Sequence, residues 1–139
     1  NVIPVFAPLT HAEGVILNTN ADTIASVIAV SMSKHFDVRL IYCFEKRGVM
    51  QNISDDSSVI TLLNTTLYEK YLTDGCFNDG ILPKLENAFA AIKAGVKEVL
   101  IGDAKDLSRN LGAETAGTLI KNCCSPRPYT IKPSTSSRN

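Results

Sequence analysis

The strongest constraint on the fold is a repeated pattern, in which an amphipathic helical segment is followed after a short break by a β-branched hydrophobic run. Apolar side chains recur at helical spacing in 21–35, and 38–44 follows with the composition of a strand. A second helical segment runs from Leu82 to Gly95 and precedes a predicted strand at 96–101. Because alternating strands and helices form βαβ units, the sequence predicts an α/β fold with a largely parallel sheet covered on both faces.

Shorter elements fill the rest of this pattern. A further helix is expected to open at a capping box of Thr66 and Glu69 and to end at Asp74 and Gly75. The other expected elements are a buried strand at 2–6, strands at 15–17, 59–61 and 117–120, a loop at 10–14 and a helical turn at 104–111.

The composition is that of one globular domain without an excess of either charge. The chain has 139 residues, of which 45% are hydrophobic, and its 14 Lys and Arg residues balance 14 Asp and Glu residues. A chain without net positive charge has no general electrostatic attraction to nucleic acid or to an anionic membrane. Its wholly apolar stretches are far shorter than the ~20 residues that span a bilayer. We therefore expect neither a nucleic-acid nor a membrane partner.

The two ends of the sequence differ from the region between them. The chain begins at Asn1 without a Met and passes directly into an apolar segment, so we expect it to be part of a longer polypeptide. Residues 122–139 contain no acidic residue and are rich in Ser, Thr and Pro, which predicts a disordered tail. The predicted domain therefore covers residues 1–121.

The sequence carries few of the motifs that would point to other chemistry. The four cysteines have neither a CxxC spacing nor a nearby His that would indicate a zinc site, and we interpret them as reduced thiols of a cytoplasmic protein. Neither GxxxxGK[ST] nor GxGxxG occurs, so the P-loop and the dinucleotide-binding fingerprint do not apply.

Polar residues gather at 18–22, where a predicted strand ends and a helix begins. Asn18 and Asn20 offer side-chain amides and Asp22 a carboxylate at a helix N-terminus, where anions and polar ligands bind in open α/β sheets. In the alternative interpretation, Asn20 caps the helix and Asp22 complements its dipole without contacting a ligand. The spacing leaves both interpretations open.

A second candidate site, at 79–84, opens the long helix. Pro83 confines this segment to the first turn, since proline is tolerated there and not deeper in a helix. Lys84 is therefore expected near the positive end of the helix dipole, where a cation is disfavoured by roughly 0.3–1 kcal/mol. A bound anion such as phosphate would compensate this cost, whereas in the alternative interpretation Lys84 points into water.

Taken together, these segments resemble the N-acetyl-L-glutamate kinases of the amino acid kinase superfamily. The likeness is carried by Asn18-Thr19-Asn20-Ala21-Asp22, by Asp79-Gly80-Ile81-Leu82-Pro83-Lys84 and by Gly95-Val96, and it ends in Gly117-Thr118-x-Ile120. It implies a three-layer αβα sandwich with a mainly parallel sheet, in which ATP phosphorylates the γ-carboxylate of N-acetyl-L-glutamate in arginine biosynthesis. This chain would be the C-terminal, ATP-binding portion of such an enzyme.

The resemblance also implies roles for individual residues. Lys84 would stabilise the transferring phosphoryl group, Asp22 would orient the catalytic lysines, and Asn18 would hydrogen-bond the acylated glutamate. Asn20 would lie beside it in the substrate site, and Mg²⁺ would be carried in with the nucleotide rather than by a metal site of the protein. The ATP pocket would be lined by Phe44, Glu45, Lys46, Gly48, Val49, Met50, Cys76, Phe77, Asn78, Asp79 and Gly80.

The sequence departs from the family pattern in two places. After the central strand, Cys43-Phe44-Glu45-Lys46-Arg47-Gly48-Val49 replaces the usual Thr/Ser-Asp-Val-x-Gly-Val run and has one extra residue. The family's N-terminal Lys, its Gly-Gly phosphate cradle and the Arg that binds the substrate carboxylate would lie before Asn1. The chain alone is therefore expected to be inactive or badly impaired.

These departures leave two alternatives open. The acceptor could be another acylated glutamate such as N-succinylglutamate, because residues upstream would build most of the acyl pocket. The chain could also be a non-catalytic α/β module that binds a nucleotide or a partner. A homodimer is expected in either case, since sheet edges and faces left uncovered favour association.

Overall fold

A four-stranded sheet forms the centre of the structure, a computed structural model that describes residues 2–52, 54–55, 57–77, 80–112 and 114–122. Strand β3 is parallel to β5 and β4 is parallel to β6, whereas β5 and β6 are antiparallel. The expectation of a mainly parallel sheet is therefore confirmed. The strand order across the sheet is β3 (Arg39–Phe44), β5 (Glu98–Asp103), β6 (Thr118–Ile120) and β4 (Leu62–Leu63).

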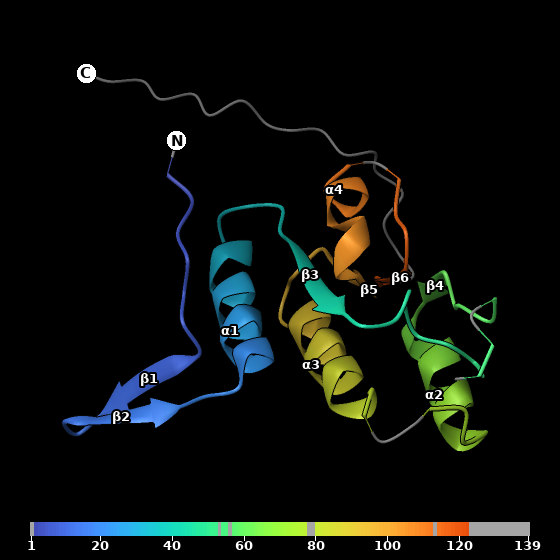
Figure 1. Ribbon diagram of the computed structural model, residues 1–139, viewed down its shortest axis with the longest axis horizontal. Coiled ribbons are helices and arrows are strands. Elements are labelled where there is room, and N and C mark those ends of the chain that lie inside the picture. Colours follow the sequence, from blue (N-terminus) through green and yellow to red (C-terminus); the bar gives the residue numbers. More distant parts are fainter. Residues whose placement is uncertain (1, 53, 56, 78–79, 113, 123–139) are drawn as a thin grey trace.

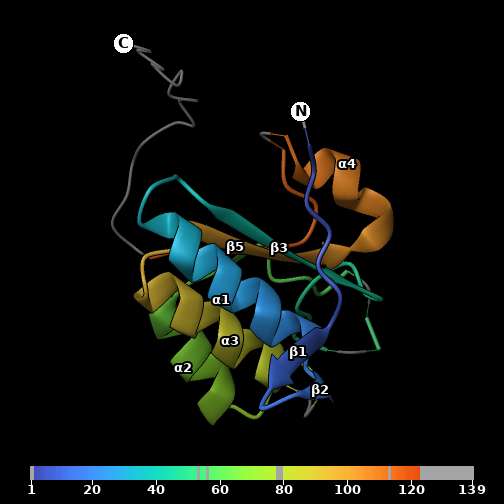
Figure 2. The same ribbon diagram turned by 90° about the vertical axis from the view of Figure 1, so that its left-hand side faces the viewer.

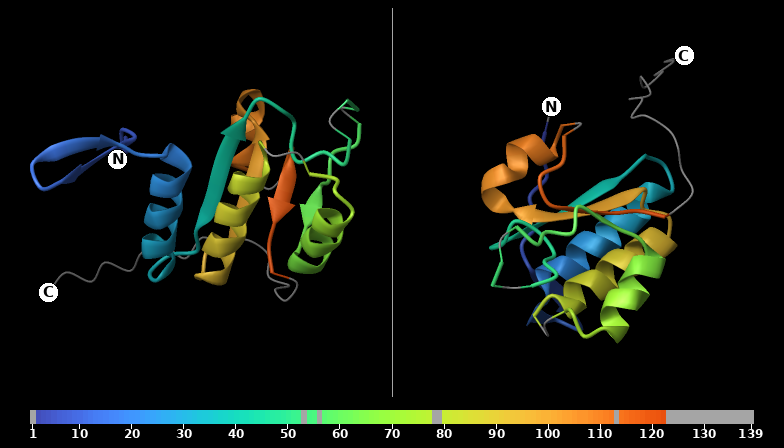
Figure 3. Two further views of the ribbon diagram at one scale, coloured as in Figure 1. Left: turned by 90° about the horizontal axis from the view of Figure 1, so that it is seen from below. Right: turned by 90° about the vertical axis from the view of Figure 1, so that its right-hand side faces the viewer.

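Helices cover both faces of this sheet, as expected for a three-layer αβα sandwich. α1 (Ala21–Ser33), α2 (Thr65–Thr73) and α3 (Leu82–Lys93) lie on one face (Figures 1 and 3). The 3₁₀ turn η1 (Ala104–Asp106) and the short helix α4 (Leu107–Asn110) lie on the opposite face (Figure 2). No helix in the described part of the chain has the length and hydropathy of a membrane span.

The core lies between α3 and the central strands. Apolar residues of α3 recur at intervals of three and four, so that Leu85, Ala88 and Ile92 share the face toward the sheet. Val99 and Ile101 of β5 belong to the same cluster and are completely buried. This packing fixes α3, and with it the first turn of α3, relative to the sheet.

The first two strands form a hairpin apart from the sheet. β1 (Leu9–Ala12) and β2 (Val15–Asn18) pair antiparallel across a two-residue turn, in which Glu13 and Gly14 have φ angles of 49° and 82°. Positive φ at both positions matches the twist of the flanking strands and makes this a tight hairpin turn. Part of the loop predicted at 10–14 is therefore strand.

The predicted buried strand at 2–6 is wrong. This segment has no regular secondary structure and its side chains are exposed, with Val2 at 94% and Val5 at 92%. Pro4 and Pro8 lack the backbone N–H group that a paired strand donates, so the hydrophobic composition of the segment does not lead to pairing.

The predicted capping box of α2 is wrong by two residues. The N-cap is Asn64, whose Oδ1 accepts a hydrogen bond of 2.9 Å from the N–H group of Leu67. Thr66 consequently lies inside the first turn. Asn and Thr side chains can both accept from the unpaired N–H groups of a first helical turn, so the sequence alone did not show which of the two is the N-cap. The end of the helix is as predicted, with Gly75 at a φ angle of 68°.

The remaining short elements lie close to their predicted positions. The helical turn predicted at 104–111 is η1 followed by α4, and the last predicted strand overlaps β6. The strand predicted at 59–61 is reduced to a single bridge between Met50 and Val59, and β4 follows it. The predicted tail, residues 122–139, lies outside the described residues except for Asn122.

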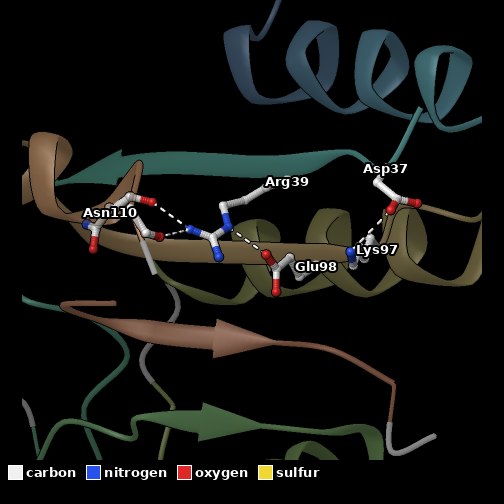
Figure 4. Close-up of polar contacts among 6 residues, drawn as sticks. Asp37, Arg39, Lys97, Glu98 and Asn110 are labelled. Carbon is white, nitrogen blue, oxygen red and sulfur yellow. Dashed lines mark hydrogen bonds and ion pairs between the residues drawn. The ribbon is translucent and has the colours of Figure 1, made fainter. Parts of the chain in front are cut away.

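A polar cluster ties the α4 layer to the sheet (Figure 4). The Arg39 Nε donates to Glu98 Oε1 at 2.6 Å, and both side chains are 12% exposed. The Arg39 Nη1 donates to the carbonyl oxygens of Asn110 and Gly112 at 2.9 and 2.8 Å. Asn110 is buried, and its Oδ1 accepts from the N–H group of Ala116 at 2.7 Å. The Arg39 guanidinium thus joins β5, through Glu98, to the end of α4 and the segment that follows it, through the carbonyl oxygens of Asn110 and Gly112.

Replacing Arg39 by Met should lower the free energy of unfolding by about 3 kcal/mol, because the Glu98 carboxylate would stay largely buried without its partner. Urea denaturation followed by circular dichroism measures this loss. Lys97→Met is the matched control: its 3.3 Å ion pair with Asp37 is more exposed, and its removal should cost about 0.5 kcal/mol. Equal losses in the two variants would contradict the assigned role of Arg39.

Candidate functional site

The N-terminus of α1 is capped by the side chain of the residue that precedes it. Asn20 is the N-cap, as predicted, and its Oδ1 accepts hydrogen bonds from the backbone N–H groups of Asp22 and Thr23 at 2.8 and 3.2 Å. Asn18 is the last residue of β2 and is exposed. The structure therefore gives the Asn20 oxygen a structural role and presents Asn18 at the surface two residues earlier.

An ion pair joins the first turns of α1 and α3. The Lys84 Nζ donates a hydrogen bond to Asp22 Oδ2, and the two side chains are 19% and 26% exposed. Leu82 and Pro83 begin α3, so that Lys84 lies in the first turn, as the position of Pro83 predicts. The anion that compensates Lys84 here is the Asp22 carboxylate. Two candidate segments that are 62 residues apart in sequence thus form one site.

Two aromatic side chains of β3 pack against this ion pair. The Lys84 Nζ is 5.7 Å from the ring centroid of Tyr42 and 5.9 Å from that of Phe44, within the range of cation–π attraction. The Tyr42 hydroxyl donates to the carbonyl oxygen of Asp22 at 3.2 Å. Burial raises the pKa of Tyr42, and the nearby Asp22 charge raises it further. Tyr42 is therefore a neutral donor that holds α1 against β3.

A cavity of about 440 Å³ opens at the carboxyl end of β3. Phe44 connects it to the ion pair, because its ring lines the cavity and is also 5.9 Å from the Lys84 Nζ. The chain after β3 forms one wall, and the segment between α2 and α3 forms the other. The lining residues are Phe44, Glu45, Lys46, Gly48, Val49, Met50, Gln51, Asn52, Gly75, Cys76, Phe77 and Ile81.

The structure brings together most of the residues that the resemblance assigns to a nucleotide pocket. Gly80 is exposed and is not among the lining residues, while Asn78 and Asp79 lie outside the described residues. The predicted residues that line the cavity are Phe44, Glu45, Lys46, Gly48, Val49, Met50, Cys76 and Phe77.

Four lining residues were not predicted from the sequence. Gly75 and Ile81 flank the ends of α2 and α3, so the predicted helix ends could have indicated them. Gln51 and Asn52 follow in the same loop as the predicted residues but outside any periodic pattern. Their place in the wall depends on how the loop folds back to pair Met50 with Val59.

The sequence matches that of known proteins over most of its length. Residues 1–103 match the family described as Amino acid kinase family. The chain is 52% identical over 112 residues to the acetylglutamate kinase of Bacteroides thetaiotaomicron, covering 80% of this chain and 44% of that enzyme. It is 54% identical over 101 residues to the acetylglutamate kinase of Bacteroides fragilis, covering 72% and 39%. The chain thus spans less than half the length of these curated relatives.

Solved structures share the same fold. The protein smu.665 of Streptococcus mutans UA159 superposes with a TM-score of 0.64 and 29% identity, over 85% of this chain and 42% of that one. Carbamate kinase from Giardia lamblia bound to AMP-PNP superposes with a TM-score of 0.63 over 82% and 41% of the two chains. At 18% identity, the second match concerns the fold alone.

Tyr42 should titrate late in the folded protein. Its pKa is raised by burial, so its neutral form contributes stability that is complete below the unfolded value of about 10 and is lost as the pH rises through the higher folded value. Tyrosinate absorbance of the wild type minus that of Tyr42→Phe measures the titration. In urea, the same difference should titrate at the ordinary value. If Tyr42 ionises at the same pH in the native protein as in urea, the buried contact with α1 is contradicted.

Proposed function

The chain belongs to the amino acid kinase family, and we propose that it is the nucleotide-binding part of an enzyme that uses ATP to phosphorylate the γ-carboxylate of N-acetyl-L-glutamate. The observation that carries this proposal is the Asp22–Lys84 ion pair beside the cavity, linked to it through Phe44. Phosphoryl transfer asks for little covalent chemistry from a protein and depends on positioned cations beside a bound nucleotide.

The ion pair supplies such a cation. Lysine has a long and flexible side chain, and the Asp22 carboxylate restricts the Lys84 ammonium to one place at the first turn of α3. The hydrogen bond from Tyr42 to the backbone of Asp22 in turn ties α1 to β3. In this proposal Lys84 stabilises the charge that develops on the transferring phosphoryl group, and Asp22 orients Lys84.

The cavity suits a nucleotide in size and in lining. Its volume of about 440 Å³ is within the range of ligand pockets, which is about 300–1,000 Å³. Met50 and Phe77 are partly exposed and offer apolar surface for a base, and Lys46 adds an exposed cation for phosphates. Bound Mg-ATP would supply the phosphoryl group, and its Mg²⁺ would neutralise part of the phosphate charge.

The relatives support the choice of acceptor. About half of the aligned residues are identical to enzymes named acetylglutamate kinase, which favours N-acetyl-L-glutamate and a place in arginine biosynthesis. In this proposal the exposed Asn18 hydrogen-bonds the acylated glutamate, while Asn20 shapes the turn between Asn18 and Asp22. We place the enzyme in the cytoplasm and propose that it works as a homodimer.

Mg-ADP should bind the cavity and slow the alkylation of Cys76, a partly exposed free thiol in its wall. Alkylation by iodoacetamide, quantified for each cysteine by peptide mass spectrometry, measures this protection. Cys43 is also a free thiol, is exposed on β3 and does not line the cavity, so its alkylation rate should not change.

Charge reversal separates nucleotide binding from a general effect of charge. Lys46→Glu should weaken the binding of Mg-ADP about tenfold or more, measured by isothermal titration, because it places an anion in the cavity wall. Lys70→Glu, on the exposed side of α2, makes the same change of charge outside the cavity and should bind like the wild type. Equal effects of the two variants, or equal protection of Cys43 and Cys76, would contradict the proposed site.

The catalytic role of Lys84 requires a complete enzyme. We expect activity from a chimera in which this chain replaces the matching 112 residues of the Bacteroides thetaiotaomicron acetylglutamate kinase. Trapping the acyl phosphate with hydroxylamine measures the rate. Lys84→Ala should lower kcat about 100-fold, whereas Lys93→Ala, at the exposed end of α3, should leave it unchanged. A folded chimera whose kcat is insensitive to Lys84 would remove this residue from the site.

A further inference from the structure

Thr118, the first residue of β6, contacts the loop that forms one wall of the cavity. Its side chain is completely buried, and its Oγ1 accepts a hydrogen bond of 2.8 Å from the backbone N–H group of Val49. Val49 lines the cavity and is itself 1% exposed. Since Val49 lies outside the strands and a buried N–H group needs a partner, the Thr118 hydroxyl takes the place of a strand neighbour.

Two glycines let the loop approach β6 this closely. A Cβ atom at Gly48 would lie 2.8 Å from Thr118 Oγ1 and 3.0 Å from Thr118 N. At Gly117, where φ is 131°, a Cβ atom would lie 2.5 Å from the carbonyl oxygen of Ile101 and 3.1 Å from that of Arg47. The backbone of the loop at 47–48 therefore lies against Gly117 and Thr118, next to the Thr118 hydrogen bond.

Thr118 is itself held in place by strand pairing. Thr118 pairs with Ile101 in the antiparallel register of β5 and β6, in the centre of the sheet. On the other side of the loop, the carbonyl oxygen of Val49 accepts from the N–H group of Ile60 at 2.8 Å. Both backbone groups of Val49 are thus held, one by a side chain of the sheet and one by the chain that leads into β4.

We propose that Thr118 is a positioning residue for nucleotide binding: its hydroxyl sets the distance between the 45–50 loop and the sheet, and thereby the width of the cavity. This inference rests on the proposed function, because it names a residue that acts on the nucleotide only through Gly48 and Val49. Thr118 does not line the cavity, so its effect on binding reports the position of the wall.

A hydroxyl deletion of nearly unchanged shape tests the proposal. Thr118→Val should weaken the binding of Mg-ADP to the full chain about tenfold in isothermal titration, and Thr118→Ser, which keeps the hydroxyl, should restore most of the affinity. Ile120→Val is the matched control, since it removes a methyl group from another completely buried residue of β6. It should bind Mg-ADP like the wild type.

Hydrogen–deuterium exchange of the unliganded chain tests the anchor independently of any nucleotide. Peptides that cover 45–50 should exchange at least tenfold faster in Thr118→Val than in the wild type, with β5 unchanged. Should Thr118→Val fail to fold, Gly48→Ala replaces no residue of the sheet but places a Cβ atom between the loop and Thr118, and it should weaken binding to a similar degree.

The outcomes separate this inference from the proposed function. Wild-type affinity and exchange in Thr118→Val, or an equal loss of affinity in Ile120→Val, would overturn the positioning role. If the folded wild type fails to bind Mg-ADP, the proposed function is wrong, and Thr118 has no positioning role for a nucleotide. Faster exchange of the 45–50 loop in Thr118→Val would then still show that Thr118 anchors this loop to the sheet.

Discussion

The ion pair between Asp22 and Lys84 depends on two helices whose first turns lie at the same edge of the sheet. α1 leads into β3 and α3 leads into β5, and these two strands are parallel. Both helices therefore begin at the carboxyl edge of the strands that follow them. The positive ends of two helix dipoles meet there, and Lys84 adds a third positive charge. The Asp22 carboxylate is the anion that compensates this concentration of positive charge.

The same topology explains why the cavity lies next to the ion pair. In open α/β sheets, ligands bind outside the carboxyl ends of the strands, where the connecting loops gather. The chain that leaves β3 after Phe44 forms one wall at this edge, and the chain that enters α3 at Ile81 forms the other. In the proposed function, a phosphate that extends from this cavity past Phe44 would reach the Lys84 ammonium, which Asp22 holds in place.

Long periodic segments were predictable, and positions that depend on distant partners were not. The spacing of apolar residues located α1 and α3, and Pro83 placed Lys84 in a first turn. The segment at 2–6 has an equally hydrophobic composition, yet no strand forms there, since pairing also needs N–H donors and a neighbour. The contact between Asp22 and Lys84 is a tertiary feature that no local pattern encodes. The resemblance to a family, by contrast, assigned both residues to one site.

The direction of β6 determines which residue can hold the cavity wall. Had β6 run parallel to β5, its last residue would lie at the carboxyl edge, with the chain already leaving the sheet. Because β6 is antiparallel, its first residue lies opposite Ile101, near the end of β5, and the Thr118 side chain reaches the loop that follows β3. Gly117 and Gly48 then remove the two Cβ atoms that would keep loop and strand apart. A reversal of strand direction in a mainly parallel sheet thus gives the cavity wall a fixed attachment to the centre of the sheet.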